Sequence, residues 1–377
     1  MKLLSIVGVR PQFVKAAMVC AAVERFNQTK SARPIRHILV NTGQHYETAM
    51  AEVFFRQLPL PTPDYSLGVG SGTHGAQTGA MLEKIEKVLL KDRPDFVIVY
   101  GDTNSTLAGA LAAVKLHIPV AHVEAGLRSF NRYMPEEINR IVADQIADVL
   151  LCPTHAAIEQ LKREGVQQSV YFSGDVMLDA VKTFAALADA SSDALSRLGI
   201  EKKQYVLATI HRAENTDSLE RMSELVEILC SLDEPTIFAI HPRLRAKLER
   251  DHQYADFQRR LNAAQKLKII PPLSYLDMLH LELHAQLILT DSGGVQKEAY
   301  FAGTPCLTLR EETEWTETLV GGWNRVVGTS PQTVLPLAQS LCAGNGASPM
   351  EQPQLSAFGD GKAAERILEI LLSKHIS

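Results

Sequence analysis

Short apolar runs alternate with longer amphipathic stretches along most of the chain. The apolar runs end in Gly, Pro, Asn or Asp, which is typical of buried strands, whereas the longer stretches repeat with a helical period. A repeated order of strand, loop, helix and strand requires parallel pairing through right-handed crossovers. The first half has expected strands at residues 3–7, 38–40, 96–100, 120–123, 149–152 and 170–172, and helices at 14–26, 75–90 and 136–147.

The same alternation begins again in the second half. Its expected strands cover residues 205–210, 235–240, 267–270, 287–290, 305–309 and 325–327. Residues 186–196, rich in Ala, Ser and Asp, are the expected joining region, and residues 361–374 form a last amphipathic helix. We therefore predict an α/β protein with two doubly wound domains facing a central cleft, where ligands of open parallel sheets bind.

The composition excludes several other classes of protein. The 377 residues include 38 Lys and Arg against 43 Asp and Glu, a net charge of −5, so nucleic acid is not an expected partner. No apolar run approaches the roughly 20 residues that cross a bilayer, and the first strand follows Met1 too closely for a signal peptide. The five cysteines include no C-x-x-C pair, which is typical of a reduced, cytoplasmic chain.

The strongest local signal for a ligand site is the turn after residues 287–290. Small residues follow the expected strand, and a new helix then begins, with Ser292, Gly293 and Gly294 at the turn. The free amides and the positive dipole end of such a helix suit a phosphate or diphosphate, and Glu298 one turn further can reach ribose hydroxyls. The alternative is an ordinary strand-to-helix turn with a good N-cap.

A second candidate follows the first strand. Arg10 offers a planar fork for a diphosphate, and Lys15 lies at a helical step beyond it. The alternative is a solvated pair of cations at a helix start. Because this loop and the Ser292 turn belong to different domains, together they are predicted to clamp one anionic ligand.

Acidic residues form a third candidate group. Asp102 and Glu124 each follow an expected strand, and Glu136 opens a helix with Arg140 four residues later on the same face. Carboxylates at successive strand ends of a parallel sheet point into one crevice, where they can divide into a proton donor and a proton acceptor. The alternative for each one is a helix N-cap or a surface ion pair.

Four histidines need separate interpretations. His211 and His241 follow expected strands, which favours a functional role. His280 and His284 share a helix face, but H-E-x-x-H is absent and no third ligand is evident, so we expect a helix surface pair and no metal. No G-x-G-x-x-G follows the first expected strand, and G-x-S-x-G is absent, which disfavours a nicotinamide cofactor and a serine nucleophile.

Several motifs, taken in order, resemble one known family, the non-hydrolysing UDP-N-acetylglucosamine 2-epimerases, over nearly the whole chain. They are G-V-R-P-Q at 8–12, T-G-Q-H at 42–45, G-D-T at 101–103, H-V-E-A-G-L-R at 122–128, P-E-E-I-N-R at 135–140, H-R-A-E-N at 211–215 and D-S-G-G at 291–294. The resemblance implies two Rossmann-like domains of the glycosyltransferase-B type. Residues 1–180 with 362–377 would carry the acid/base groups, and residues 181–361 would bind UDP.

The resemblance also implies a reaction, the inversion of C2 in a UDP-linked 2-acetamido sugar by elimination and re-addition of UDP. Its implied catalytic residues are Asp102, Glu124, Glu136, His211 and Lys15. Its implied UDP-sugar ligands are Arg10, Arg140, His241, Ser292, Gly293, Gly294, Glu298 and Arg310. No cofactor is expected, and family members are commonly homodimers. A hydrolysing epimerase or a glycosyltransferase of the same fold is the alternative.

The chain also departs from the commoner family pattern. Val9 and Gln12 replace the Thr and Glu of G-T-R-P-E, Trp315 lies in E-W-T-E where E-R-P-E is usual, and Lys297 replaces an acidic residue. These features resemble the branch that acts on UDP-2,3-diacetamido-2,3-dideoxy-glucuronic acid, whose carboxylate Arg132 or Arg325 would bind.

The family's substrate-activation site is only partly matched. Gln44, His45, Arg212 and Glu136 fit it, whereas Glu47 and His74 replace the expected Gln and Arg. The resemblance therefore does not predict allosteric activation by substrate.

Overall fold

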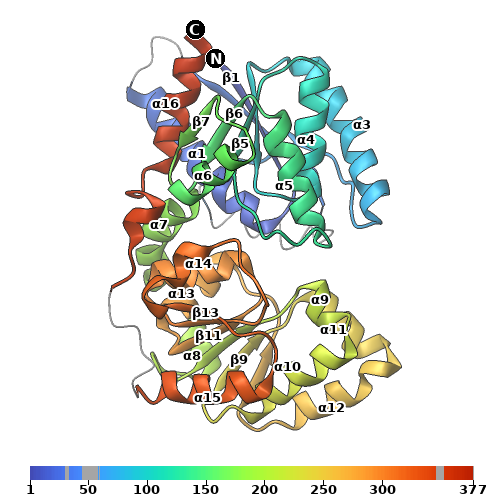
Figure 1. Cartoon of the computed structure of the whole chain (residues 1–377), viewed down its shortest axis with the longest axis vertical. Helices are drawn as coiled ribbons and strands as arrows, with labels where there is room; N and C mark the ends of the chain where they lie inside the picture. Colours follow the sequence, from blue (N-terminus) through green and yellow to red (C-terminus); the bar gives the residue numbers. More distant parts are fainter. Residues whose placement is uncertain (30–33, 45–57, 59, 345–351, 377) are drawn as a thin grey trace. The chain divides into compact units, whose positions relative to one another are not determined.

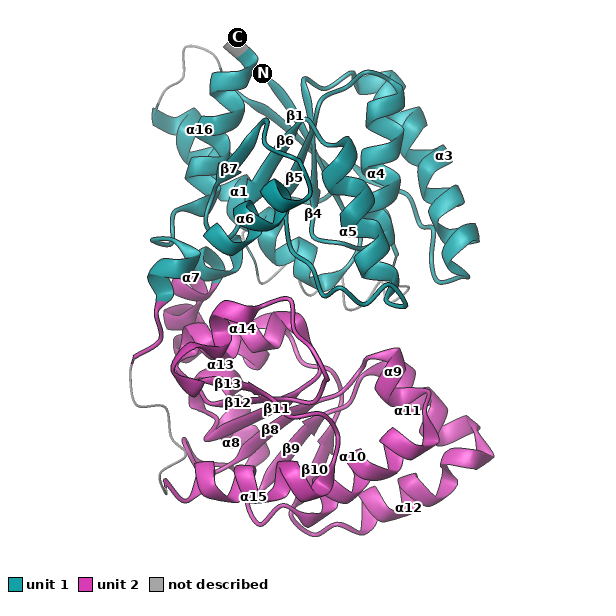
Figure 2. Cartoon of the chain, in the orientation of Figure 1, with its two compact units in different colours: residues 1–180, 355–377 teal, residues 181–354 magenta. Residues whose placement is uncertain are grey.

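The computed structural model describes residues 1–29, 34–44, 58, 60–344 and 352–376. They form two compact units, unit 1 (Met1–Ala180 with Leu355–Ser377) and unit 2 (Val181–Gln354), coloured separately in Figure 2. The chain passes from unit 1 to unit 2 inside helix α7 (Val176–Ser191). The expectation of a joining region at 186–196 is therefore wrong, because most of that segment is helical and all of it belongs to unit 2.

Unit 1 is built on a parallel sheet whose strands, among the described residues, follow the order β3-β2-β1-β4-β5-β6-β7. The short β3 was not predicted, because two residues show no alternating pattern. The strands are β1 (Lys2–Val7), β2 (Arg36–Asn41), β3 (Tyr65–Ser66), β4 (Phe96–Tyr100), β5 (Val120–Val123), β6 (Val149–Cys152) and β7 (Val170–Phe172).

Helices cover both faces of this sheet (Figure 1). One row of helices packs α3 against α4 and α4 against α5, while α1 contacts α16. Strand residues such as Leu4, Ile6 and Val99 pack beneath α3 and α4 in one apolar cluster. The helices are α1 (Arg10–Thr29), α3 (His74–Asp92), α4 (Asn104–Lys115), α5 (Pro135–Ile146), α6 (His155–Arg163), the first part of α7, the short η3 (Leu355–Phe358) and α16 (Ala363–Ile376).

The C-terminal segment returns to unit 1 through specific hydrogen bonds. The Asp175 amide donates to the Phe358 carbonyl over 2.8 Å, and the chain belongs to unit 1 again from Leu355 onward. The Asp179 carboxylate accepts from the amides of Ala363 (3.0 Å) and Ala364 (2.8 Å), which satisfies the start of α16. Residues far apart in sequence thus close unit 1.

Unit 2 repeats the architecture with a second parallel sheet, in the order β10-β9-β8-β11-β12-β13 among the described residues. Its strands are β8 (Val206–Thr209), β9 (Thr236–Ala239), β10 (Leu267–Ile270), β11 (Leu287–Thr290), β12 (Cys306–Thr308) and β13 (Asn324–Val326). Its helices are the rest of α7, α8 (Ala194–Leu198), α9 (Ala213–Thr216), α10 (Leu219–Ser231), α11 (Pro242–Arg250), η1 (His252–Tyr254), α12 (Ala255–Ala263), α13 (Tyr275–His284), α14 (Gly293–Ala302), η2 (Thr316–Gly322) and α15 (Pro331–Cys342).

Alternate residues of these strands bury into different apolar clusters. Leu287 and Leu289 pack with residues of α10, α12 and α15, whereas Ile288 between them packs with residues of α8, α13 and α14. This alternation is the period of a strand covered on both faces. The predicted fold class, α/β with two doubly wound parallel sheets, is confirmed, and the shared cleft between the units stays a prediction.

The loop after β5 has an unusual backbone. Glu124 and Gly126 both have positive φ, 77° and 85°. A side chain at Gly126 would collide with the backbone carbonyl oxygen of Ala157 at the start of α6. Glycine is thus required here by both the backbone conformation and the close approach of a neighbouring helix.

We expect Gly126→Ala to reduce the free energy of unfolding by about 1–3 kcal/mol more than Gly165→Ala, because only the first adds a backbone collision. Gly165 is a matched control, since its φ is +82° but no atom lies within 4 Å of an added Cβ. Urea denaturation of both variants measures the difference. An equal loss of the free energy of unfolding in both variants would show that the close packing of this loop does not contribute to stability.

Candidate active site

Three of the charged residues of unit 1 that the sequence singled out lie where central strands end. Arg10 is the first residue of α1 after β1, Asp102 follows β4, and Glu124 follows β5. Since β4 pairs in parallel with both β1 and β5, these positions lie at the same edge of the sheet. The predicted grouping at the strand ends therefore has a structural basis.

Glu124 forms an ion pair with Lys15, which lies on α1. The two side chains are only 9% and 8% exposed, so the pair is largely shielded from water. A Cβ added to Gly101, the residue before Asp102, would lie 3.1 Å from Glu124 Oε2 and 3.5 Å from Lys15 Nζ. The backbone before Asp102 therefore lies directly against this pair, and the left-handed conformation of Glu124 is held by its surroundings.

Asp102 forms a second ion pair, with Arg140 of α5. Arg140 is buried and also contacts Glu137 at 3.2 Å, whereas the Asp102 side chain is 30% exposed. Asn139 fixes the same loop by donating to the Asp102 carbonyl over 2.9 Å. Glu136 is separate from these pairs: it is half-buried in the first turn of α5, and its carboxylate makes no ion pair with the described residues.

Gln12, one of the departures from the family pattern, joins two loops. Its Oε1 accepts from the Gly8 amide over 2.8 Å, and its Nε2 donates to the Tyr100 carbonyl over 2.7 Å. Nε2 also lies 3.0 Å from the Thr103 hydroxyl. An amide both accepts and donates here, so it connects the end of β1 to the end of β4.

The sequence reasoning missed a buried network beneath these loops. His122 Nδ1 lies 2.7 Å from Asp144, and Nε2 lies 2.7 Å from the Gly101 carbonyl. Arg128 also donates to Asp144 over 2.6 Å. Burial alone would raise the pKa of Asp144, but the charges of and hydrogen bonds from His122 and Arg128 outweigh it and lower that pKa.

His122 thus joins the Asp144 carboxylate to the Gly101 carbonyl through its two ring nitrogens. It fixes the Gly101 carbonyl immediately before Asp102. The signal in the sequence was its place in H-V-E-A-G-L-R, inside β5 and two residues before Glu124.

In unit 2, Asp291 organises the end of β11. This fully buried carboxylate accepts from the amides of His211 (3.0 Å) and Arg212 (3.0 Å) and from the Asn215 side chain (3.1 Å), and it lies 3.1 Å from His211 Nδ1. Burial would raise the pKa of Asp291, but the charge of His211 and these hydrogen bonds hold it below its usual value. Asp291 thus orients His211, a role that the sequence did not reveal.

The structure also brings His211 and His241 together. Their ring centroids lie 5.7 Å apart, although the residues follow different strands, β8 and β9. His241 Nδ1 accepts from the Arg243 amide over 3.2 Å and so caps α11. The His211 side chain is 38% exposed, which leaves it accessible to a ligand.

The Ser292 turn has the predicted geometry of strand, small residues and helix. Ser292 is the N-cap of α14, with Oγ accepting from the Val295 amide over 3.4 Å. A Cβ at Gly293 would lie 2.6 Å from Glu314, so packing explains that glycine. Gly294 meets only Ser292 Oγ, at 3.8 Å, so packing against the described residues does not explain the second glycine.

Glu314 lies between two arginines near this turn. Arg310 Nη1 donates to Glu314 over 2.9 Å, and Arg212 Nη2 lies 3.7 Å from it. Arg310 is fully buried, and its Nε and Nη2 have no hydrogen-bond partner in the part of the chain that the structure describes. Glu298 is also buried, on α14.

The replacement residues Lys297 and Trp315 contact each other. The Lys297 ammonium lies 3.7 Å from the centre of the Trp315 ring, a cation–π contact, and both side chains are buried. Two residues that depart from the commoner family pattern therefore form one packed unit beside Gly293, whose added Cβ would lie 3.3 Å from Trp315 Nε1.

Of the residues matching the activation site, Gln44 accepts from the Ser105 amide over 3.0 Å, and His74 lies 3.2 Å from Asn104. His45 and Glu47 lie outside the described residues.

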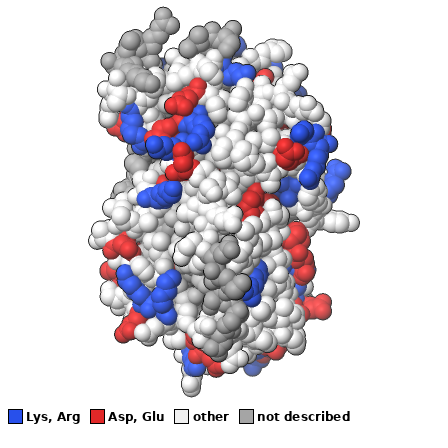
Figure 3. All heavy atoms as spheres, turned by 60° about the vertical axis from the view of Figure 1, so that its left-hand side comes forward, with Lys and Arg blue, Asp and Glu red and all other residues white. Residues whose placement is uncertain are grey.

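The distribution of charged side chains on the surface agrees with the nearly equal numbers of basic and acidic residues in the sequence. On the face shown in Figure 3, acidic and basic side chains are interspersed. Among the described residues, none of the helices combines the length and apolar character that crossing a bilayer requires.

Comparison with known proteins identifies the family. A sequence model described as UDP-N-acetylglucosamine 2-epimerase matches residues 27–372. A UDP-N-acetylglucosamine 2-epimerase homolog of Methanococcus maripaludis is 46% identical over 372 residues, 98% of this chain and 99% of that protein. The UDP-2,3-diacetamido-2,3-dideoxy-D-glucuronate 2-epimerase of Pseudomonas aeruginosa is 46% identical over 377 residues, again 98% and 99%.

Comparison with a solved structure points to the same family. The UDP-GlcNAc 2-epimerase of Methanocaldococcus jannaschii, in complex with UDP-GlcNAc and UDP, superposes with a TM-score of 0.89 at 43% identity and covers 99% of this chain and 100% of that chain. The resemblance seen in the motifs is confirmed. The chain belongs to the UDP-N-acetylglucosamine 2-epimerase family.

Proposed function

We propose that the chain inverts C2 of a UDP-linked 2-acetamido sugar without net hydrolysis, using the carboxylates of unit 1 for proton transfer. The observation that carries this proposal is the pairing of two carboxylates with two cations at neighbouring strand ends, Glu124 with Lys15 and Asp102 with Arg140. Two separately positioned carboxylates suit a reaction that removes a proton from one side of a carbon and returns one to the other.

The proposed steps balance as an elimination followed by an addition. One carboxylate takes the C2 proton, the C1–O bond breaks, and UDP leaves with that electron pair, so that a C1–C2 double bond forms. The other carboxylate then protonates C2 from the opposite side while a UDP oxygen bonds to C1 again. Because the C2 proton is weakly acidic, stabilisation of the departing UDP must carry much of the first step.

The proposed diphosphate ligands are Arg10 and the backbone amides at the start of α14. Ser292 caps this helix, and the added Cβ at Gly294 finds open space beyond Ser292 Oγ, which is what close approach by a ligand requires. His211, oriented by Asp291, would assist on the same nucleotide sugar. The related enzyme of Methanocaldococcus jannaschii, solved in complex with UDP-GlcNAc and UDP, supports a UDP-sugar as the ligand.

For the substrate, we propose the branch with acetamido groups at C2 and C3 and a carboxylate at C5. The support is the 46% identity to the enzyme of Pseudomonas aeruginosa named for that sugar, together with the Lys297–Trp315 contact. UDP-GlcNAc is the alternative substrate. Arg132 and Arg325 are the proposed partners of the extra carboxylate.

We further infer a cytoplasmic homodimer from the family resemblance and the cysteine chemistry. The five cysteines are free, and three of them are buried. Free thiols are typical of a reducing compartment.

The overall proposal is tested by incubating the purified chain in D2O with each of the two UDP-sugars and following C2 by NMR. We expect deuterium at C2 in both epimers with the UDP-sugar intact, and faster exchange with the diacetamido uronic acid. Free UDP that accumulates without any deuterated UDP-sugar would instead identify a hydrolysing epimerase or a transferase. Binding without exchange would identify a UDP-sugar sensor.

Asp102→Asn and Glu124→Gln are each expected to lower kcat by about 100-fold or more, with modest effects on substrate binding. The amide keeps the shape of the side chain but cannot accept or donate the proton as a carboxylate does. Glu159→Gln is the matched control, since that carboxylate is 58% exposed on the surface of the same unit. Steady-state kinetics with circular dichroism of each variant measures the effect. Near-normal kcat in both variants would remove the acid/base role.

Arg10→Ala is expected to weaken binding of UDP itself by about 10–100-fold, the usual loss when a hydrogen bond to a charged group is removed. Arg25→Ala on the same helix is the control, because Arg25 is 57% exposed and pairs with the exposed Glu365. Isothermal titration with UDP measures both variants. Unchanged affinity after Arg10→Ala would exclude Arg10 from the diphosphate site.

A further inference from the structure

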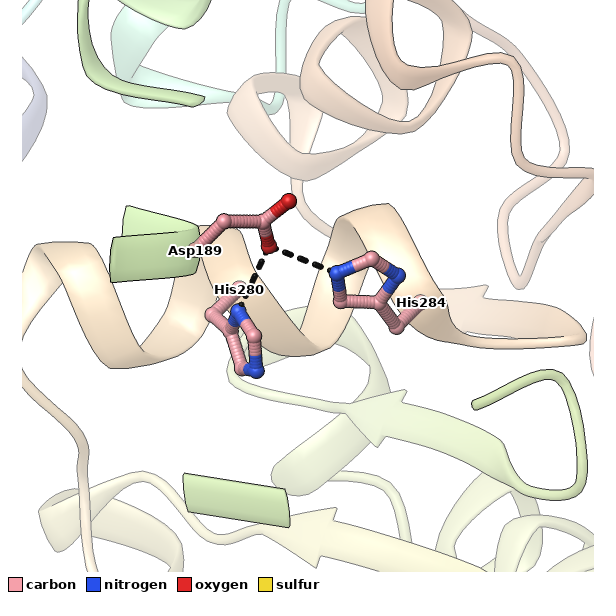
Figure 4. A group of neighbouring side chains, drawn as sticks. All are labelled: Asp189, His280 and His284. Atoms are coloured by element: carbon pink, nitrogen blue, oxygen red, sulfur yellow. Dashed lines mark hydrogen bonds and ion pairs between the residues drawn. The ribbon is translucent and has the colours of Figure 1, made fainter. Parts of the chain in front are cut away.

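Asp189, His280 and His284 form a compact group within unit 2 (Figure 4). His280 Nδ1 lies 2.9 Å and His284 Nε2 lies 2.6 Å from the same oxygen, Asp189 Oδ1. The expectation of a simple surface pair is wrong for His280, which is only 5% exposed. The third group was not evident in the sequence because Asp189 lies 91 residues before His280.

Two helices create this group. His280 and His284 occupy positions four residues apart on the last turns of α13, so their rings share one face and lie 4.8 Å apart, centroid to centroid. Asp189 comes from α7 and is 46% exposed, so the group opens to solvent on the carboxylate side. The C-terminal end of α13 also provides a negative dipole end, which favours a cation.

The side chains supply the donor set of a transition metal. Imidazole nitrogens and a carboxylate oxygen are the usual ligands of Zn²⁺, and three protein ligands with water in the fourth position make a common zinc site. The three candidate ligand atoms lie within 4.8 Å of one another. Zinc bonds of about 2.0–2.2 Å place ligand atoms about 3.3 Å apart, so the exposed carboxylate would move away from the rings and the more distant ligand atoms would move closer together.

Metal binding also depends on where the hydrogens of the two imidazole rings lie. In the hydrogen-bonded arrangement each ring directs an N–H at Asp189, and a metal requires that hydrogen to move to the other ring nitrogen. Burial lowers the pKa of His280, helped by the charges of His284 and Lys202, and these effects outweigh the opposing influence of Asp189. Lys202 is the neighbouring cation that opposes binding of a metal ion.

We propose that Asp189, His280 and His284 bind one divalent transition-metal ion of the zinc class. The proposal is independent of the proposed reaction, because none of the proposed catalytic residues lies on α7 or α13.

The proposed ion would have a structural effect. The helix α7 carries the chain from unit 1 into unit 2, and the ion would fasten its last turns to α13. Two existing contacts join the same segments: the Phe184 and Tyr275 rings meet edge to face at 5.8 Å, and the Ser192 hydroxyl donates to Asp277 over 2.6 Å. A metal link would add to these contacts and raise the stability of unit 2 by mass action.

The test uses the full chain without a histidine tag, stripped with EDTA and dialysed against ZnCl2. We expect one zinc per chain by elemental analysis and a melting temperature that rises with zinc concentration, while MgCl2 has no effect. Asp189→Asn and His284→Gln should each weaken zinc binding by more than the 10–100-fold that loss of an outer-shell partner costs. His252→Ala, at an exposed histidine of the same unit, should bind zinc like the parent chain.

Co²⁺ provides a second readout on the unaltered chain, in case a variant does not fold. A saturable visible ligand-field spectrum, abolished by one equivalent of Zn²⁺, is expected from this site. Absence of zinc uptake and of the cobalt spectrum in the parent chain would overturn the proposal. Zinc uptake that persists unchanged in folded Asp189→Asn and His284→Gln would also overturn it, because the ion would then be bound elsewhere.

Discussion

Parallel strand pairing is the constraint on which the rest of the structure depends. In a parallel sheet the carboxyl ends of neighbouring strands lie at one edge. Strand pairing alone therefore brings the loops after β1, β4 and β5 together. Charged residues in those loops must then find partners, because an unpaired charge removed from water is very costly. The pairs Glu124–Lys15 and Asp102–Arg140 meet that requirement and at the same time position two carboxylates at the sheet edge.

A second layer of buried polar groups makes this arrangement rigid. His122 connects Asp144 to the carbonyl of Gly101, and Arg128 donates to the same Asp144 carboxylate. Breaking such a network leaves an uncompensated buried charge, which is far more destabilising than losing a surface ion pair. Unit 2 uses the same principle with other residues, since Asp291 satisfies two backbone amides while it orients His211.

The sequence could predict what depends on local pattern. The strands at 96–100, 120–123, 149–152, 267–270 and 287–290 have the predicted bounds, because each is an apolar run followed by turn residues. The strand β3 was not predicted, because two residues are too few to show a strand pattern. Residues 186–196 were wrongly predicted as a joining region, because their small polar residues are also tolerated in a helix.

The parts of the sites that were missed depend on distant contacts. Asp291 accepts hydrogen bonds from the amides of residues 79 and 80 positions earlier. Asp189 contacts the ring nitrogens of histidines 91 and 95 positions later. No local spacing contains that information, since it arises only when the helices and strands pack. The candidates found from the sequence were those whose strand-end position already implied a common edge.

A crystal structure of the chain with its UDP-sugar bound tests the central claim most directly. The account predicts diphosphate oxygens on the backbone amides of Ser292–Gly294 and beside Arg10, with the carboxylates of Asp102 and Glu124 on opposite sides of the sugar C2. A nucleotide bound away from the α14 N-terminus, with both carboxylates facing bulk water, would contradict it.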